Sequence, residues 1–265
     1  MSIFETIVIA IVEGLTEFLP ISSTGHMIIV SSFLHISTDP FTKLFEVAIQ
    51  FGAILSVVVL YWKRFLSLNK MNFYFKLVVA VIPALALGFI FSKKIDELME
   101  SPLTVSITML IGGILLLFID SLFKEPTIEK EENISLSKAF TIGVWQCFAM
   151  IPGTSRSAAS IIGGMQQKLT RNLAAEFSFF LAVPTMAAAT GYKLLKVWKE
   201  NPELLQNKDN LIALALGNMV AFVVAMIAIK FFIGFLQKHG FRLFGWYRVI
   251  IGALLLTLIL TGYLN

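Results

Sequence analysis

The amino-acid sequence predicts an all-α polytopic membrane protein, and both its composition and the length of its apolar runs indicate this fold class. Of its 265 residues, 57% are hydrophobic and 14% are charged, whereas a typical soluble domain carries about 25% charged residues. The runs 103–119, 211–229 and 249–264 contain no charged residue. Each run is near the roughly 17–25 residues that a helix needs to cross a bilayer.

The sequence argues against a cleavable signal peptide, against disulfides or a multi-cysteine metal site, and against a nucleic-acid partner. The first Lys or Arg is Lys43, so the N-terminus lacks the basic region of a secretory signal peptide, and we expect the first segment to stay in the mature protein. The single cysteine, Cys147, excludes an intramolecular disulfide and a multi-cysteine metal site. The net charge of +4 comes from scattered basic residues, which suits membrane topology and not a nucleic-acid partner.

The apolar stretches form two groups of four. In order along the chain, they cover residues 3–34, 44–62, 73–92, 103–119, 139–166, 173–195, 211–232 and 246–264. A polar segment, 120–138, separates the two groups. We therefore expect a single membrane domain over 1–265, with one repeat at 1–119, a linker at 120–138 and a second repeat at 139–265.

The first stretch of each group is interrupted. Pro20 removes a backbone donor, and the Ser-Ser-Thr-Gly that follows favours turns over helix. Pro152 and Gly153 interrupt the second stretch in the same way. Lipid cannot satisfy the freed backbone groups, so such breaks persist only inside protein or beside a water-filled cavity. We predict re-entrant helical hairpins at 3–34 and 139–166, and six transmembrane helices from the other stretches.

The two interrupted stretches also resemble each other. They align without a gap at a shift of 132 residues, which matches Pro20 with Pro152, and a shift of 130 superposes Glu46 on Glu176. The identities are few, but both halves have a broken polar segment, then hydroxyl residues, then a helix with Glu near its start. Interrupted segments at corresponding positions are typical of inverted-topology repeats with a site at their interface, and we predict that arrangement.

The distribution of basic residues predicts an orientation, because Lys and Arg are in excess on the cytoplasmic side. If the first hairpin enters from outside, the inside loops hold 13 Lys or Arg and cover 63–76, 120–138, 168–171 and 230–248. The outside loops hold 7 and cover 35–43, 93–101 and 193–209. We therefore expect both termini to face outward.

Several ionisable residues lie within apolar stretches, where such groups are costly and usually mark a functional cavity. Glu13 and Glu17 are four residues apart, so they share one helix face and repel each other. A hard divalent cation, Mg²⁺ or Ca²⁺, prefers carboxylate oxygens and would relieve that repulsion. The alternative is a pair of carboxylates on the wet face of an interfacial helix.

His26 is a candidate base or nucleophile, because it follows the Ser-Ser-Thr-Gly and lies nine residues after Glu17. Its ordinary pKa suits proton transfer near neutral pH. The alternative is a packed, hydrogen-bonded histidine, which is the commoner role for a lone one.

The stretch PGTSRSAAS, residues 152–160, predicts a phosphate cradle. Its glycine, Gly153, lets the backbone approach a ligand, and its hydroxyls come from Thr154, Ser155 and Ser157. A half-helix that begins there offers its first N–H groups to an anion, and the planar fork of Arg156 suits phosphate oxygens.

The alternatives are helix capping for the serines and a structural ion pair for Arg156 with Glu46 or Glu176. We expect Glu46 and Glu176 to have structural or supporting roles.

These motifs resemble those of a known family. EGLTEFLPISSTGH, residues 13–26, resembles the E-x-x-x-E and serine-histidine motif of the integral-membrane undecaprenyl-diphosphate phosphatases of the bacitracin-resistance type. PGTSRSAAS resembles their second signature, PGxSRSxxT, with Ser160 in place of the usual threonine. FEVAIQFGAIL and EFSFFLAVP also resemble family segments, so the likeness covers nearly the whole chain.

The resemblance implies hydrolysis of undecaprenyl diphosphate, a C55 lipid carrier, to undecaprenyl phosphate and inorganic phosphate. That reaction recycles the carrier for peptidoglycan and other cell-wall polymers and gives bacitracin resistance. It also implies a divalent cation, a place in the bacterial inner membrane and an active site open to the periplasmic face. The family's functional residues fall on Glu13, Glu17, Ser23, Thr24, His26, Ser155 and Arg156.

For this chemistry we expect Arg156 and the backbone around Ser155 to bind the transferring phosphoryl group. The other predicted diphosphate-binding residues are Ser22, Thr24, Gly153, Thr154 and Ser157. Glu13 and Glu17 would hold the cation. His26 would be the nucleophile or a base that activates Ser23 or water; the sequence does not separate these roles, and we favour His26 as the reactive centre.

A transporter is the competing class, because inverted repeats with broken helices are also a transporter architecture. The same cradle could carry undecaprenyl phosphate or a related phosphorylated lipid across the bilayer. Transport needs no nucleophile, so it explains the Glu-Glu-His set less well. A combined phosphatase and flippase, and a homodimer, stay open.

Overall fold

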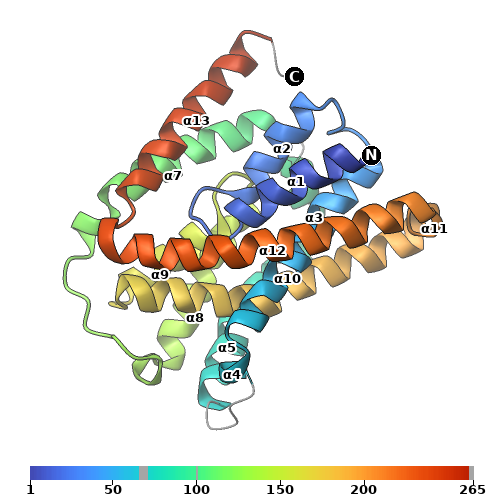
Figure 1. Ribbon diagram of the computed structural model, residues 1–265. Coiled ribbons are helices and arrows are strands. Elements are labelled where there is room, and N and C mark those ends of the chain that lie inside the picture. Colours follow the sequence, from blue (N-terminus) through green and yellow to red (C-terminus); the bar gives the residue numbers. More distant parts are fainter. Residues whose placement is uncertain (66–70, 100, 263–265) are drawn as a thin grey trace.

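The computed structural model describes residues 1–65, 71–99 and 101–262, and most of these residues lie in helices that loops connect (Figure 1). The α-helices are α1 Ile3–Thr16, α2 Ser23–Phe33, α3 Pro40–Leu60, α4 Trp62–Phe65, α5 Met71–Ile90, α6 Ser92–Met99, α7 Pro102–Leu122, α8 Leu136–Gln146, α9 Arg156–Gln166, α10 Arg171–Glu200, α11 Glu203–Gln206, α12 Lys208–His239 and α13 Arg242–Leu260. The 3₁₀ turns within the described ranges are η2 Glu131–Asn133 and η3 Cys147–Met150. The predicted all-α class is confirmed.

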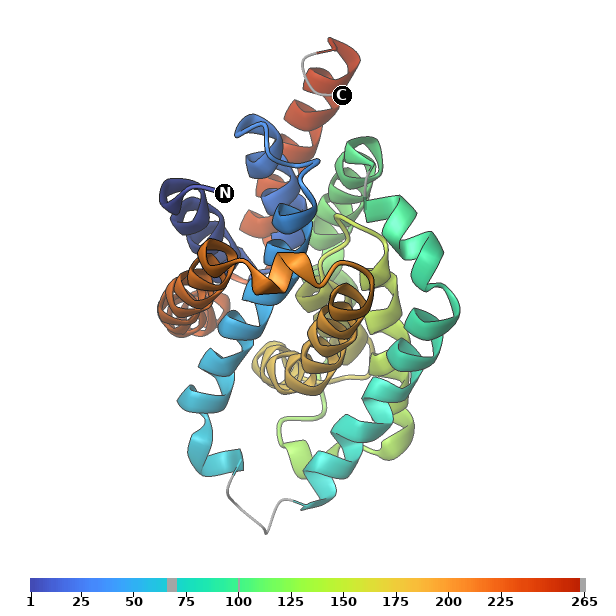
Figure 2. The ribbon, with the colours of Figure 1, turned by 90° about the vertical axis from the view of Figure 1, so that its right-hand side faces the viewer.

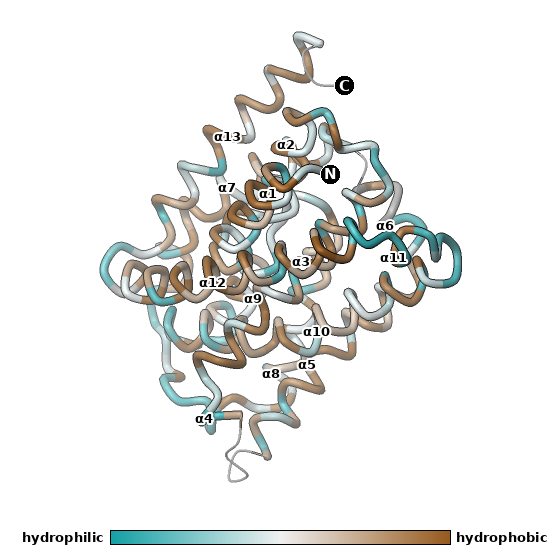
Figure 3. Tube along the Cα trace, turned by 45° about the vertical axis from the view of Figure 1, so that its right-hand side comes forward, coloured by the Kyte–Doolittle hydropathy of each residue, from teal (hydrophilic) through white to brown (hydrophobic). Residues whose placement is uncertain are grey.

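Six of these helices are long and apolar enough to cross a membrane, as predicted: α3, α5, α7, α10, α12 and α13. Local sequence explains where several of them begin. The Asp39 side chain accepts the Thr42 N–H before Pro40 at the start of α3, and Ser101 accepts the Thr104 N–H before α7. Figure 3 shows hydrophobic residues along the long helices and hydrophilic ones at the loops, as around α11.

The two interrupted stretches each form a helical hairpin. α1 and α2 have 14 and 11 residues, and α8 and α9 have 11 each, which is too short to cross a bilayer. The two ends of each hairpin lie together, because Thr42 contacts the Met1 sulfur and the Lys138 ammonium donates to the Gln167 carbonyl. The breaks fall where Pro20 and Pro152 predict them. Entry and exit on one membrane face stay a prediction.

The hairpin helices begin at matching positions. α1 begins at Ile3 and α8 at Leu136, while α2 begins at Ser23 and α9 at Arg156, so both pairs are 133 residues apart. This offset is one residue larger than the shift of 132 that aligns the sequences. The inverted repeat and the division into 1–119, 120–138 and 139–265 stay predictions.

The hairpins pack across the two halves of the chain. α1 packs against α12 of the second half, and α8 packs against α5 of the first half. α3 contacts both α10 and α12, which Figure 2 shows nearly end-on, and α7 packs against α13. This exchange brings the two interrupted segments together in the middle of the molecule (Figure 1).

Segments predicted to share the inner side contact one another. The last turn of α7 meets the start of α10 through an ion pair between Asp120 and Arg171, 2.6 Å apart. The loop that follows α7 contacts the residues before α10 through an isolated bridge between Ile128 and Leu169. Arg64 pairs with Glu131, and the Asp120 carboxylate also accepts the N–H of Phe241, the residue just before α13. These contacts join segments of the predicted inner loops to one another.

Two residues counted with the predicted loop 230–248 lie well inside helices. Arg248 lies inside α13 and is fully buried, and Lys230 lies inside α12. The prediction that 230–248 is a loop is therefore wrong: α12 runs to His239 and α13 begins at Arg242. Without these two residues the inner loops still hold more Lys and Arg than the outer loops. Lys70, another counted residue, lies outside the described residues.

Candidate active site

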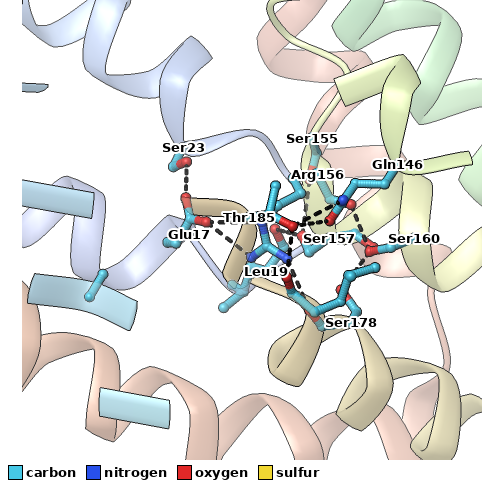
Figure 4. A network of polar contacts seen from close by, with 12 residues as sticks. Glu17, Leu19, Ser23, Gln146, Ser155, Arg156, Ser157, Ser160, Ser178 and Thr185 are labelled. Atoms are coloured by element: carbon cyan, nitrogen blue, oxygen red, sulfur yellow. Dashed lines mark hydrogen bonds and ion pairs between the residues drawn. The ribbon is translucent and has the colours of Figure 1, made fainter. Parts of the chain in front are cut away.

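The candidate site forms where the two chain breaks meet. We name residues 17–22 tip one and residues 147–155 tip two. Arg156, the first residue of α9, pairs with Glu17 of tip one through its Nη2, 3.0 Å from Oε1, and donates its Nη1–H to the Ser178 carbonyl. Figure 4 shows this contact, and both side chains of the ion pair are less than 10% exposed. Removing one member of a buried pair typically costs about 3–5 kcal/mol, so this pair joins the tips.

The second carboxylate oxygen of Glu17 accepts a hydrogen bond from a serine hydroxyl. Ser23, the first residue of α2, donates its Oγ–H to Glu17 Oε2 at 2.6 Å (Figure 4). Glu17 therefore lies between a serine hydroxyl and a guanidinium. A carboxylate at this distance is positioned to accept the serine proton.

Serine caps begin the second helix of each hairpin. Ser22 accepts the Gly25 N–H, and Ser155 accepts the Ala158 N–H. Both serines have positive φ, 73° and 74°, a conformation that is uncommon outside glycine and clusters at functional sites. Ser155 therefore caps a helix, which was the alternative role for the serines, and it also lines the central cavity.

Glu13 lies one helical turn before Glu17 and has no solvent exposure. Neither of its carboxyl oxygens has a hydrogen-bond partner among the described residues, and its carboxyl interacts electrostatically with that of Glu17. The wet-face alternative for this pair is wrong, because both side chains are buried.

A buried, unpartnered carboxyl beside a second one fits a hard cation. The described residues contain no cluster of three His, Cys, Asp or Glu side chains that could hold a metal unaided. The donor set therefore fits a cation held by two carboxylates together with substrate phosphate oxygens, which is the usual mode for Mg²⁺.

His26 is turned toward α13. Its Nδ1 lies 2.7 Å from the Ser22 carbonyl oxygen, and its Nε2 lies 2.7 Å from the Tyr247 hydroxyl. Since a carbonyl only accepts, Nδ1 carries the proton, and Nε2 of the neutral ring accepts from Tyr247. The rings of His26 and Tyr247 also stack, with centroids 5.6 Å apart. Ser23 and Arg156 are not among the hydrogen-bond partners that the described residues offer this ring.

The predicted cradle divides into two kinds of residue. Gly153, with φ of 85°, closely approaches α7, where an added Cβ would lie 2.6 Å from the Val105 carbonyl oxygen. The Thr154 carbonyl accepts from Arg248, and Ser157 donates to the Leu19 carbonyl at 2.8 Å. Thr154 and Ser157 therefore hold the tips together, while Gly153 and Ser155 reach the cavity wall.

A cavity of about 600 Å³ opens beside this cluster. Its polar wall contains the predicted residues Glu17, Ser22, Ser23, Thr24, Gly153, Ser155 and Arg156. The rest of the lining is largely apolar and comes mainly from α5, α10 and η3, including Leu85, Phe89, Met150, Met186, Ala188 and Ala189. A lining with a polar part and a larger apolar part suits an amphiphilic ligand with an anionic head group.

Sequence reasoning missed several polar residues at this site. Gln50 and Gln146 both line the cavity and are buried, and Gln146 donates to the Thr185 hydroxyl at 3.2 Å. Each stands alone in an apolar stretch, VAIQFGA or VWQCF, and that isolation was the available signal. Ser178 also supports Arg156 through its carbonyl.

Arg156 pairs with Glu17 and not with Glu46 or Glu176, so the alternative of a structural ion pair between Arg156 and one of those two glutamates is wrong. Glu176 binds Arg64 at 2.8 Å near the inner loops. Glu46 has one buried carboxyl oxygen without a partner among the described residues.

Comparisons with known proteins agree with these motifs. Residues 6–254 match the family described as bacitracin resistance protein BacA. The chain belongs to this family.

Relatives that align with nearly the full length of this chain are named undecaprenyl-diphosphatase. The chain is 57% identical over 256 residues to the undecaprenyl-diphosphatase of Flavobacterium psychrophilum, which covers 97% of this chain and 95% of the relative. It is 51% identical over 265 residues to that of Bdellovibrio bacteriovorus, which covers 99% of this chain and 98% of the relative. Family membership therefore extends over both hairpins and all six long helices.

The geometry of Arg156 generates a prediction about anion binding. Arg156→Lys should weaken binding of inorganic diphosphate by about 10-fold, or 1.4 kcal/mol, because an ammonium cannot reproduce the planar fork. Isothermal titration calorimetry of the purified protein in detergent measures this. Arg171→Lys is the matched control, since Arg171 forms an exposed pair at the inner loops. Equal affinities in the two variants would assign Arg156 to structure alone.

Proposed function

We propose that this protein hydrolyses undecaprenyl diphosphate to undecaprenyl phosphate and inorganic phosphate, and so recycles the lipid carrier for cell-wall polymers. The observation that carries the proposal is the buried Ser23–Glu17–Arg156 cluster on the wall of a largely apolar cavity. The names of relatives that are 51–57% identical support the same substrate.

The proposed reaction begins with binding of the terminal phosphoryl group at Arg156 and Ser155. The Ser178 carbonyl and the Glu17 carboxylate both accept hydrogen bonds from the Arg156 guanidinium and so hold it in place. A diphosphate that approaches this guanidinium competes with Glu17 for its N–H groups. The Glu17 carboxylate that loses these bonds keeps its contact with the Ser23 hydroxyl.

In the proposed first step, Ser23 Oγ attacks the terminal phosphorus while Glu17 accepts the hydroxyl proton. The bond between this phosphorus and the bridging oxygen breaks, and undecaprenyl phosphate leaves with the bond's electron pair. Glu17 passes the proton that it accepted to the leaving phosphate. Water then attacks the phosphorus of the phosphoserine and gives a proton to Glu17, while the bond between phosphorus and Ser23 Oγ breaks. Glu17 returns this proton to Ser23 Oγ, and inorganic phosphate is released. The 2.6 Å contact between Ser23 and Glu17 supports serine as nucleophile. Our expectation that His26 is the reactive centre stays as the alternative.

Glu13 and Glu17 are the residues that would hold Mg²⁺ or Ca²⁺. A bound cation supplies charge neutralisation at the phosphoryl oxygens. Burial of Glu13 without a hydrogen-bond partner supports this assignment, since an isolated buried carboxylate is costly. Thr24 also faces the cavity and belongs to the proposed head-group site.

The proposed location is the bacterial inner membrane, with the site open to the periplasmic face. The excess of basic residues in the loops that gather around Asp120 and Glu131 supports placing that end in the cytoplasm. A homodimer in that membrane is part of the proposal only as an arrangement compatible with the exposed apolar helix faces.

One observation favours transport as a second activity. The two hairpins pack on opposite halves of the chain, α1 on α12 and α8 on α5, which is the exchange expected of inverted repeats around a central site. A flippase for undecaprenyl phosphate would use the same head-group residues without breaking a bond.

Phosphate release separates the two activities. Purified protein in detergent should release inorganic phosphate from undecaprenyl diphosphate, and chelation of divalent cations should abolish the release reversibly. Glu13→Gln, which removes one negative charge from the cation-binding pair, should raise the cation concentration for half-maximal activity by about 10-fold or more. A protein that binds the lipid but releases no phosphate is a transporter, and an unchanged cation requirement in Glu13→Gln removes Glu13 from the cation site.

The nucleophile is identified by two substitutions and a trapping experiment. Ser23→Ala should abolish turnover, and His26→Ala should retain slow turnover, reduced by about 10²–10⁴-fold if His26 acts as a base or orients one. Wild type quenched in acid during turnover should carry phosphate on Ser23, detected by mass spectrometry. Acid-labile phosphate on His26, with activity left in Ser23→Ala, would make histidine the nucleophile.

Orientation is tested by cysteine labelling in a Cys147→Ala background. A cysteine at Gln206, the exposed last residue of α11, should react with an impermeant thiol reagent in intact cells, whereas one at Glu129, exposed in the linker, should not. Permeabilised cells should label both. The reverse pattern in intact cells would put the site on the cytoplasmic face.

A further inference from the structure

Arg248 is a fully buried arginine whose partners are all backbone carbonyls. It lies in α13, 0% exposed. Its five donor contacts run from Nε to Met109 at 3.4 Å, from Nη1 to Pro20 at 3.2 Å and Thr154 at 2.8 Å, and from Nη2 to Thr108 at 3.1 Å and Gly153 at 2.8 Å. A guanidinium has five N–H donors, so every one is used. It forms no ion pair with a described residue.

These carbonyls belong to three separate elements. Pro20 lies in tip one, Gly153 and Thr154 lie in tip two, and the other two acceptors lie on α7. At Pro20, Gly153 and Thr154 the chain lies between helices, so these carbonyls lack helical partners and lipid offers none. The Arg248 side chain therefore donates hydrogen bonds to carbonyls at both chain breaks and fixes the distance between them.

We propose that Arg248 is a positioning residue that sets tip two against tip one, and thereby aligns Arg156 and Ser155 with Glu17 and Ser23. Thr154 precedes Ser155 directly, and Pro20 lies between Glu17 and Ser23. A shift at either carbonyl therefore moves a proposed reacting group. The inference rests on the proposed phosphatase function.

Tip one also contacts the start of α9, which follows tip two directly. Ser157 donates to the Leu19 carbonyl at 2.8 Å, and Arg156 pairs with Glu17. The Arg156 pair is the one that a bound diphosphate would loosen. Arg248 and Ser157 then remain to hold the tips in register while the phosphoryl group is bound.

A substitution at Gly112 can disturb the hydrogen bonds of the Arg248 guanidinium while Arg248 itself is kept. It lies on α7 beside the guanidinium, and an added Cβ would lie 2.8 Å from Arg248 Cζ. Gly252 on α13 is a matched control, because its added Cβ would meet Leu110 Cγ at 3.0 Å and the Ser106 carbonyl at 3.1 Å. Alanine at either position crowds the α7–α13 contact, but only Gly112→Ala displaces the guanidinium.

The first test compares kcat and KM for phosphate release. Arg248→Lys, whose compact ammonium has three donors for five carbonyls, and Gly112→Ala should each lower kcat by about 10²-fold, the scale of a misplaced reacting group. Gly252→Ala should stay within a few-fold of wild type, with a similar unfolding temperature. Equal losses in Gly112→Ala and Gly252→Ala, or a near-normal kcat in Arg248→Lys, would overturn the proposal.

A second comparison uses Ser157→Ala in a double-mutant cycle. Because Arg248 and Ser157 hold the same two tips, the double variant should lose more kcat than the product of the single losses. Arg248→Lys combined with Gly252→Ala should give the simple product. A simple product in both cycles would mean that Arg248 does not act through the tips.

Hydrogen exchange supplies a readout that does not depend on activity. In Arg248→Lys, amides of residues 17–24 and 150–158 should exchange faster than in Gly252→Ala at equal global stability. Unchanged exchange in either tip contradicts the positioning role, whatever the activity. If wild type releases no phosphate but this exchange pattern appears, the proposed function fails while the link between the tips stands.

Discussion

Two interrupted helices meet at the centre of this protein, and their unpaired backbone groups must be satisfied by the protein itself because lipid offers no hydrogen bonds. Each buried carbonyl left without a partner would cost about 1–3 kcal/mol. Arg248 meets this requirement for Pro20, Gly153 and Thr154 at once. Packing of α7 against α13 brings that guanidinium to the tips, so the position of the last helix and the shape of the site depend on each other.

The same junction supplies the chemistry. A chain that turns back within the molecule exposes helix starts and polar side chains at its tips, and here both turns do so at one place. Ser22 and Ser155 begin helices there, and Glu17 lies between Ser23 and Arg156. Burial makes these charge interactions stronger than they would be in water, and prior organisation removes the cost of arranging them during a reaction.

The cavity explains why such a cluster belongs in an apolar protein. Its polar wall carries the reacting residues, and the rest of its lining is largely apolar and comes mainly from α5, α10 and η3. A lipid diphosphate has one charged end and one long hydrocarbon chain, and the two parts of the lining match them. Family membership across residues 6–254 includes every element that builds this cavity.

The sequence by itself determined the membrane class, the six long helices, the breaks at Pro20 and Pro152 and most residues of the polar wall. These features depend on local causes: apolar run length, missing backbone donors, capping side chains and isolated polar residues. Tertiary structure decided which charges pair, because Arg156 meets Glu17 across 139 positions of the chain and leaves Glu176 to Arg64. It also turned His26 toward Tyr247 and buried Arg248 against a carbonyl 228 residues away. Such contacts follow from how helices pack against one another, and no spacing in the sequence encodes that packing in a form that local rules can read.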